Sequence, residues 1–328
     1  MKKVKFNNTN LTVSPVCLGT VNYGTDLSES DSKLQLSKFV EVGGNFIDTA
    51  QIYGAWGSGL DNYSEYVIGN WIKETGQRHN IVLATKGAHP RWSSMDVPRV
   101  NADCIEEDLN NSLKLLNTDY IDLYFLHRDD TNTPVAEIME CLDKARKSGK
   151  IKHYGCSNWN LSRIKEAQEY CKLNGLEGFV CNQLMWSLAD INFEYVPDKT
   201  FILMDKETGA YSAETGMNVM AYMSIAKGYF TRRAAGENLP SSVAATYTNA
   251  SNDAIFELAG SVVAGGEYGY MDLALMYIMA EKSFPAVPIA SFDNMEQLDE
   301  CISCLGKLIP QDVIEKLAQM KKFTYWEK

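Results

Sequence analysis

The sequence lacks any long hydrophobic run, since no stretch of its 328 residues approaches the roughly 20 apolar residues that span a membrane. It also lacks an apolar core behind the basic start MKKVKFNNTNLTV, so we predict no secretory signal peptide. Basic residues are in deficit, with 31 Lys and Arg against 42 Asp and Glu and a formal net charge of −11. This balance argues against nucleic acid or an anionic membrane as the main partner.

Histidine is scarce, and no metal site is predicted. The four histidines are His79, His89, His127 and His153, and none forms an HxH or HxxxH pair. The eight cysteines are scattered, mostly within apolar stretches, which indicates reduced and buried thiols in a cytoplasmic protein. A GxGxxG motif after a strand is missing as well, so a Rossmann domain is not predicted.

What the chain does have is a regular alternation of short apolar runs and amphipathic stretches. Eight runs have the length of strands: Val16–Leu18, Asn45–Ile47, Ile81–Ala84, Ile121–Leu126, His153–Cys156, Gly178–Asn182, Val219–Tyr222 and Ala286–Ile289. Helical patterns lie between several of them: Ser30–Val42, Ser64–Thr75, Ala102–Leu116, Ala136–Ser148 and Leu161–Leu173. A strand, a crossover helix and a parallel strand form a βαβ unit, and eight such units close into a barrel.

We therefore predict an α/β protein with a (β/α)8 TIM-barrel fold, and no linker divides residues 1–328 into more than one domain. The runs Val4–Phe6 and Leu11–Val13 flank a polar turn, which is typical of a short N-terminal β-hairpin. Residues Pro310–Lys321 predict a C-terminal helix. Two connections, Ala189–Gly216 and Phe230–Ser251, are longer than a barrel loop needs, and we interpret them as lids or mobile segments.

Ionisable side chains stand at the ends of three neighbouring runs. Asp48, Lys86 and His127 end the second, third and fourth apolar runs, and Tyr53 lies one short loop beyond Asp48. Barrels carry their chemistry at the carboxyl ends of the strands, and buried ionisable groups need partners. We therefore expect these four side chains to meet.

Longer motifs around these residues resemble those of the aldo-keto reductases. They are GGNFIDTAQIYG at 43–54, ATKG at 84–87, DLYFLH at 122–127, GKIKHYGCSNW at 149–159, CNQ at 181–183, MAYMSIAKG at 220–228 and, more loosely, VPIASFDNMEQLDE at 287–300. The sequence HRDD at 127–130 resembles the motif at this position in a bacterial subgroup of the family. The resemblance covers nearly the whole chain, in the family's order and spacing. It implies a barrel enzyme that interconverts a carbonyl and an alcohol with a nicotinamide cofactor.

The resemblance also implies roles for the four strand-end residues. Tyr53 would be the general acid that protonates the carbonyl oxygen. Free tyrosine has a pKa of about 10, and a Lys ammonium about 4 Å away contributes roughly 4 kcal/mol at an effective dielectric of about 20. We therefore expect Lys86 to lower the Tyr53 pKa by as much as about 3 pH units. Asp48 would hold Lys86 charged and aimed, and His127 would orient the carbonyl in either protonation state.

A further set of residues would bind the cofactor, as the same resemblance implies. Around the nicotinamide these are Gly19, Thr20, Asp48, Ser157, Asn158, Gln183 and Tyr222, with Tyr222 stacked on the ring. Beside the pyrophosphate they are Ser224, Ala226 and Gly228, and toward the adenosine end they are Ser291, Asp293 and Gln297.

The choice between NADP and NAD stays open. The family slightly favours NADP, but relatives often carry Gly followed by Arg or Lys where this chain has Ser291, Phe292 and Asp293. A carboxylate at Asp293 repels a 2′-phosphate and accepts hydrogen bonds from a ribose hydroxyl, which favours NAD. Arg232 and Arg233, in the connection after the seventh run, are either phosphate ligands or solvated loop charges.

The residues near the strand ends indicate a small carbonyl substrate, with sugars and glycosides among the candidates. Possible contacts are Trp56, Trp92, Arg128 and Trp159. Asp129 and Asp130 are either acceptors for sugar hydroxyls or caps of the helix after Pro134. A second class of function also stays open, because some relatives are cofactor-binding regulatory modules that keep the same four strand-end residues without significant turnover. The oligomeric state is not predicted.

Overall fold

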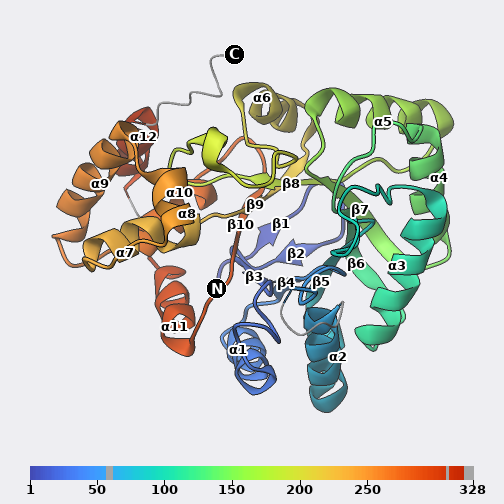
Figure 1. The fold of residues 1–328 in the computed structure, drawn as a ribbon, viewed down its shortest axis with the longest axis horizontal. Coiled ribbons are helices and arrows are strands. Elements are labelled where there is room, and N and C mark those ends of the chain that lie inside the picture. The colour runs from blue at the N-terminus through green and yellow to red at the C-terminus, as the bar shows by residue number, and fades with distance from the viewer. Residues whose placement is uncertain (57–61, 308–309, 321–328) are drawn as a thin grey trace.

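The computed structural model describes residues 1–56, 62–307 and 310–320, and their main feature is a closed barrel of parallel strands (Figure 1). The strands are β3 Cys17–Gly19, β4 Phe46–Asp48, β5 Val82–Gly87, β6 Ile121–Leu126, β7 Ile151–Ser157, β8 Cys181–Met185, β9 Asn218–Tyr222 and β10 Ala286–Ala290. They follow each other around the barrel in chain order, and β10 closes it against β3. The predicted (β/α)8 fold is confirmed, although β8 begins three residues later than the run that predicted it.

The five predicted crossover helices are present. They are α1 Glu29–Glu41, α2 Tyr63–Thr75, α3 Ala102–Leu115, α4 Val135–Lys147 and α5 Leu161–Asn174, and they surround β3 to β8 in Figure 1. Ser28 and Asn101 cap α1 and α3, because each side chain accepts a hydrogen bond from a backbone N–H in the first turn. Gly76 ends α2 with a φ of 69°, a left-handed conformation that glycine adopts without steric cost.

The two long connections contain short helices that the sequence did not predict, and their interpretation as lids or mobile segments stays a prediction. The first contains the 3-10 turn η2 Phe193–Tyr195 and helix α6 Lys206–Thr215. The second connection contains α7 Tyr229–Ala234 and α8 Ser241–Tyr247, and its last two residues are the first two of α9 Ala250–Val263. The helices α7 and α8 have 6 and 7 residues, which is too short for a clear helical period in the sequence. After them, α10 Tyr270–Met279 leads to β10, and α11 Met295–Cys304 follows.

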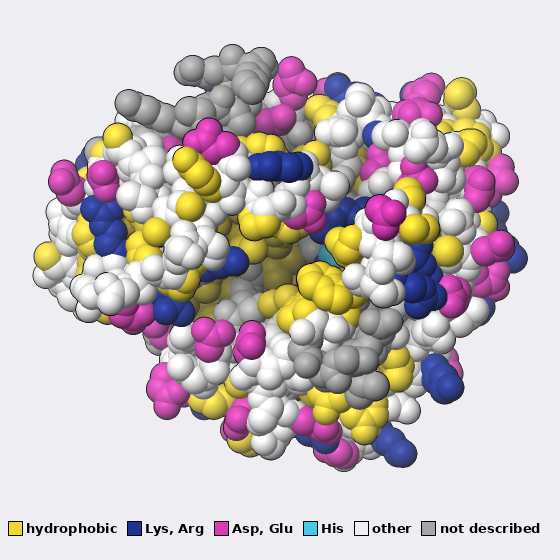
Figure 2. Space-filling model, viewed as in Figure 1, with side chains coloured by type: hydrophobic (Ala, Val, Ile, Leu, Met, Phe, Trp, Pro, Cys, Tyr) yellow, Lys and Arg dark blue, Asp and Glu magenta, His cyan; other side chains and the backbone are white. Residues whose placement is uncertain are grey.

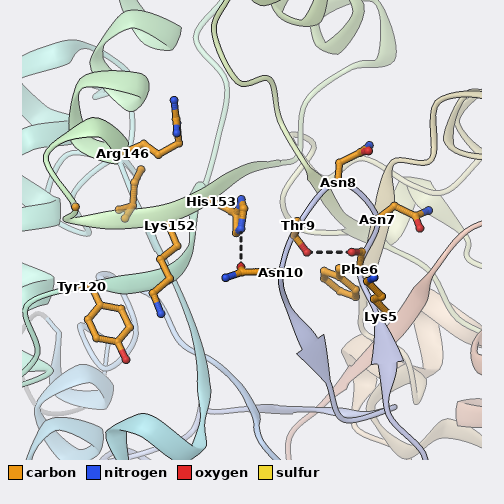
Figure 3. A pocket seen from close by; sticks show the side chains of 12 residues that line it. Lys5, Phe6, Asn7, Asn8, Thr9, Asn10, Tyr120, Arg146, Lys152 and His153 are labelled. Atoms are coloured by element: carbon orange, nitrogen blue, oxygen red, sulfur yellow. Dashed lines mark hydrogen bonds between the residues drawn. The ribbon is translucent and has the colours of Figure 1, made fainter.

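The predicted hairpin is confirmed as β1 Val4–Lys5 and β2 Thr12–Val13. Phe6 in its turn packs among the side chains inside the barrel and meets the Phe46 ring edge-on at 5.7 Å. Figure 3 shows this turn facing the starts of β6 and β7 across a groove of about 1000 Å³, where Asn10 contacts His153. Lys152 on that wall is held by Asp122 at 3.0 Å, so its charge is already compensated.

A helix is present near the C-terminal end of the described residues, as expected. It is α12 Gln311–Met320, and the predicted final residue Lys321 lies outside the described residues. Among the helices that the structure describes, none combines the length and apolar character needed to cross a membrane.

Candidate active site

The period of a β-strand explains why the predicted residues converge. Side chains alternate between the two faces of a strand, so every second residue points into the barrel. The packed interior includes Phe46, Ala84, Phe125, Cys181 and Met220. Two positions further along each of these segments stand Asp48, Lys86, His127, Gln183 and Tyr222. The site is therefore one more layer of inward-facing side chains at the carboxyl ends of the strands, above an apolar core.

A buried ion pair forms the centre of this layer. The Lys86 ammonium donates to Asp48 Oδ2 at 2.5 Å, to the Thr49 carbonyl at 2.8 Å and to Tyr53 Oη at 3.3 Å. The side chains of Lys86 and Asp48 are only 1% and 2% exposed. Gln183 donates its amide to the other Asp48 oxygen at 2.9 Å. Both charges are thus paired and hydrogen-bonded, as burial requires.

The expected fall in the Tyr53 pKa is wrong for this state of the protein. Burial raises the pKa of the Tyr53 phenol, and the Lys86 charge offsets only part of that increase. Asp48 works in the same direction as burial, because its negative charge faces the same ammonium and disfavours a phenolate. Burial opposes the Lys86 charge as well, but Asp48 and Tyr53 raise the Lys86 pKa overall. A charged lysine therefore contacts a protonated phenol.

His127 is neutral, which decides a question that the sequence left open. Burial, together with His89, Arg128 and Lys86, holds the pKa of His127 well below its ordinary value of 6.5. Its ring lies between two others, with ring centres 5.9 Å from Tyr53 and 4.8 Å from His89. Among the described residues its Nδ1 has no hydrogen-bond partner. A neutral imidazole at this position can donate one hydrogen bond to a ligand.

A large cavity opens above these residues, with a volume of about 1170 Å³. Figure 2 shows it as a hollow lined largely by hydrophobic side chains, with histidine visible in its wall and charged residues at its rim. Of the predicted residues, the lining includes Gly19, Thr20, Asp48, Tyr53, Trp56, Trp92, His127, Arg128, Ser157, Asn158, Gln183, Tyr222, Ser224, Gly228, Ser291, Asp293 and Gln297. The volume exceeds the range of about 300–1000 Å³ typical of small-ligand pockets, which suits a dinucleotide and a substrate together.

Two predicted contact residues do not line the cavity. Trp159 is fully buried, where its indole N–H donates to the Arg128 carbonyl and its ring packs on Phe179. It supports the wall from behind and cannot stack on a substrate in this structure. Ala226 is 2% exposed and also lies behind the lining. Lys86 is absent from the lining too, and it lies behind the lining residues Asp48 and Tyr53, which it contacts.

The predicted nicotinamide contacts form one connected group. Tyr222 donates its hydroxyl to Asn158 Oδ1 at 2.6 Å, and the Asn158 amide donates to the His127 carbonyl at 3.3 Å. Asn158 has a φ of 62°, a left-handed conformation that asparagine tolerates better than most residues. The chain packs closely at Gly19, where a Cβ would lie 2.6 Å from the Ser291 hydroxyl and 2.9 Å from Ile289 Cγ2, so a larger residue would displace these side chains. These polar groups, strung along one groove, fit a nicotinamide cofactor.

Charges also gather at the far end of the groove. Arg232 contacts Glu237 at 2.9 Å and lies 3.9 Å from Asp293, and all three line the cavity. Gln297 accepts a hydrogen bond from the Asp293 backbone at 2.9 Å. Arg233 pairs with Asp253 at 2.6 Å and is not part of the lining, so it is no phosphate ligand here.

The opposite end of the cavity is aromatic. Trp56 meets Tyr53 and Trp92 at ring-centre distances of 6.1 and 5.9 Å. Arg128 pairs with Asp198 at 2.7 Å and lies over the Phe201 ring at 5.2 Å. The sequence did not point to Asp198 or Phe201, because both come from a connection some 70 residues away along the chain. No local pattern marks such a pairing.

Asp129 and Asp130 take neither of the two predicted roles. Asp129 lies 3.5 Å from Arg163, and Asp130 accepts hydrogen bonds from the Asn132 backbone and from the Thr133 hydroxyl. The N-cap of α4 is Pro134, and neither aspartate lines the cavity. These two carboxylates hold the connection between β6 and α4, and they are not placed to bind sugar hydroxyls.

The fold and the site together define a barrel protein with a buried Asp, Tyr, Lys and His set beside a dinucleotide-sized groove. Residues 15–322 match the model of the Aldo/keto reductase family. The chain belongs to this family of oxidoreductases, whose members use NAD(P)H.

Several similar proteins cover almost the whole chain. "Uncharacterized oxidoreductase YrpG" of Bacillus subtilis (strain 168) is 30% identical over 97% of this chain and 95% of its own length. "Norsolorinic acid reductase B" of Dothistroma septosporum is 27% identical over 93% of this chain and 77% of its own. Among solved structures, aldo-keto reductase AKR11C1 from Bacillus halodurans, in its holo form, is 25% identical with a TM-score of 0.77, and each chain is covered completely.

Proposed function

We propose that this protein reduces an aldehyde or ketone with NAD(P)H and runs the reverse oxidation. The observation that carries the proposal is the contact of Tyr53 Oη with the Lys86 ammonium, 3.3 Å away at the wall of the cavity. A protonated phenol next to a fixed cation is a hydrogen-bond and proton donor aimed at the place where an alkoxide would develop. A bound nicotinamide cofactor supplies the hydride.

Each member of the set has a separate task in this proposal. Tyr53 delivers its proton to the carbonyl oxygen, and Lys86 stabilises the phenolate that remains. Asp48 keeps Lys86 charged and, through its contact with Gln183, fixed in place. His127 donates a second hydrogen bond to the carbonyl oxygen, because its neutral ring carries one N–H. Two donors on one oxygen fix the plane of the carbonyl relative to the groove.

The walls support a substrate with a flat ring beside its carbonyl. Trp56 and Trp92 offer exposed aromatic faces, and Phe201 adds a third aromatic ring to the lining. Sugars and glycosides also remain candidates, because the C–H face of a sugar ring can pack on an aromatic side chain although the ring is not flat. Two of the residues that favoured a sugar substrate no longer support it, because Asp129 and Asp130 do not line the cavity. A reductase is in keeping with the name of one relative, norsolorinic acid reductase B.

For the cofactor, we favour NADH over NADPH. Arg232, the cation that could pair with a 2′-phosphate beside Asp293, is already compensated by Glu237 and Asp293. Replacing Asp293 by asparagine should therefore shift the ratio of dissociation constants toward NADPH by about five- to tenfold, since an exposed carboxylate near a phosphate repels it modestly. Titrations followed by tryptophan fluorescence measure the ratio. Asp299→Asn, on α11, is the control, and an equal effect of both variants would contradict the assignment.

The test of the function separates an enzyme from a regulatory module. NADH and NADPH are titrated by quenching of tryptophan fluorescence, and their oxidation is then followed with a panel of aromatic, aliphatic and sugar carbonyls. Micromolar binding with turnover supports the reductase. Binding without turnover of any panel member would favour the cofactor-binding module. No binding of either nucleotide would overturn the proposal.

A further inference from the structure

His89 is a second histidine at the reaction centre, and the function proposed above gives it no task. It follows β5 and lines the cavity, and its ring centre is 4.8 Å from that of His127 with the planes tilted by 58°. The residue is 6% exposed, so most of its ring is packed and its position is defined. Since His127 and Tyr53 flank the place of the carbonyl oxygen, His89 borders the atoms attached to the carbonyl carbon.

A buried polar cluster fixes the backbone on which His89 stands. Ala88 has a φ of 59°, a left-handed conformation, and its N–H donates to Asp108 Oδ2 at 2.8 Å. Arg99 binds the same carboxylate through two nitrogens at 2.6 and 2.9 Å and donates to the His89 carbonyl at 3.3 Å. A bidentate Arg–Asp ion pair restricts the movement of both side chains. This corner is therefore held by α3, and it presents the His89 ring to the cavity.

The hydrogen bond of His89 determines which ring nitrogen is an acceptor. Nδ1 lies 2.7 Å from the Pro90 carbonyl oxygen, which can only accept, so Nδ1 carries the proton. Burial and the Arg128 charge lower the pKa of His89 to about 4, so the ring is neutral near pH 7. Nε2 is then a lone-pair acceptor. Within the described part of the chain no hydrogen bond engages it.

We propose that His89 Nε2 accepts a hydrogen bond from a hydroxyl on the carbon next to the substrate carbonyl, so that the site selects α-hydroxy carbonyl compounds. This inference rests on the proposed function and narrows its substrate class. The wall would then hold two donors, Tyr53 and His127, for the carbonyl oxygen and one acceptor for its neighbour. A substrate without the hydroxyl leaves the His89 acceptor without a partner or traps a water there, and either outcome weakens its binding.

The experiment compares phenacyl alcohol with its methyl ether. Both have a flat ring and an oxygen atom on the carbon next to the ketone, but only the alcohol can donate a hydrogen bond. We expect the wild-type protein to reduce the alcohol with a kcat/KM about tenfold higher than the ether, the size of one neutral hydrogen bond. In His89→Phe, which keeps a planar ring without the acceptor, the ratio should fall to about one. His89→Gln, which restores an acceptor, should recover part of it.

A matched variant and a binding measurement make the outcomes distinct. Trp92→Phe alters the same connection and should change kcat/KM for both ketones by a similar factor. Quenching titrations with the nicotinamide cofactor check that His89→Phe is folded and keeps its groove. A wild-type ratio near one, an unchanged ratio in His89→Phe, or turnover of other carbonyls but of neither ketone would overturn the inference. If no carbonyl is reduced at all, the proposed function itself fails and the inference fails with it.

Discussion

Replacing Tyr53 by phenylalanine should lower kcat/KM for carbonyl reduction by about 10²- to 10⁴-fold, the range that a general acid contributes. The ring and its packing against Trp56 and His127 stay in place, and only the hydroxyl that contacts Lys86 is lost. The loss should fall on kcat, because the phenol protonates the substrate oxygen as the alkoxide forms and contributes less to ground-state binding. Cofactor affinity should not change.

The measurement is steady-state reduction of one aldehyde by wild type and variant, with a fluorescence titration of the cofactor for each. Tyr66→Phe is the control, because Tyr66 is an exposed tyrosine on α2 outside the cavity lining. Full activity in Tyr53→Phe would show that another group donates the proton. Loss of both turnover and cofactor binding would point to a structural defect.

The raised pKa of Tyr53 gives the two reaction directions different pH dependence near neutrality: reduction should be flat, and oxidation should rise with pH. Reduction needs the phenol, which stays protonated at neutral pH because burial raises its pKa above the ordinary value of about 10. Oxidation needs the phenolate, so its rate should rise with pH across the neutral range. His127 adds no inflection there, since its pKa lies well below 6.5. Rate profiles of the wild type in both directions, set beside the Tyr53→Phe profiles, check this part of the prediction.

Replacing Glu65 by glutamine should raise the free energy of unfolding at pH 8 by as much as about 3 kcal/mol. Glu65 is fully buried between α2 and the barrel, where it accepts a hydrogen bond from Thr85 Oγ1 at 2.5 Å. Burial, which outweighs the hydrogen bond from Thr85, raises its pKa from 4.5 to about 7. The difference between the two values corresponds to about 3 kcal/mol.

The sign follows from proton binding. Between about pH 4.5 and pH 7 the folded state binds more protons at Glu65 than the unfolded state, so the contribution of Glu65 to stability falls as the pH rises. The loss of stability from burying the ionised Glu65 carboxylate is absent below about pH 4.5 and complete above about pH 7. Glutamine keeps an oxygen that accepts from Thr85 and has no charge to desolvate. The part of the pH dependence that Glu65 causes should therefore be absent from the variant, which keeps the opposite contributions of His89 and His127, whose pKa values are lowered in the folded state.

Denaturant unfolding of wild type and Glu65→Gln at several pH values from 5 to 8 measures the effect. Glu74→Gln is the matched control, because Glu74 lies on the same helix and is 57% exposed in its pair with Lys33. It should leave the pH dependence of the wild type intact. If Glu65→Gln unfolds with the wild-type pH dependence, a different buried group is responsible.

The order of the elements and the inward direction of the central residues were accessible from the sequence. Both depend on local rules. Strand-length apolar runs alternate with helical patterns, and the period of two continues the inward-facing positions along each strand to Asp48 and Lys86 at its carboxyl end. His127 follows the same rule. The helices α7 and α8 were missed because segments of 6 and 7 residues carry too little of a helical period.

What only the tertiary structure decided are properties that depend on desolvation and on partners distant in the chain. Trp159 has a side chain that could stack on a substrate, but it is buried behind the residues that line the cavity. The sequence allowed a Tyr53 pKa lowered by Lys86, and the depth of burial reversed the direction. The pairing of Arg128 with Asp198 also requires the folded chain, since the two stand on separate connections. Periodicity is a local property of a chain, so the sequence by itself determined the barrel and the place of its site. Burial and charge pairing depend on what surrounds a side chain. The tertiary structure therefore decided the protonation states and the wall residues of that site.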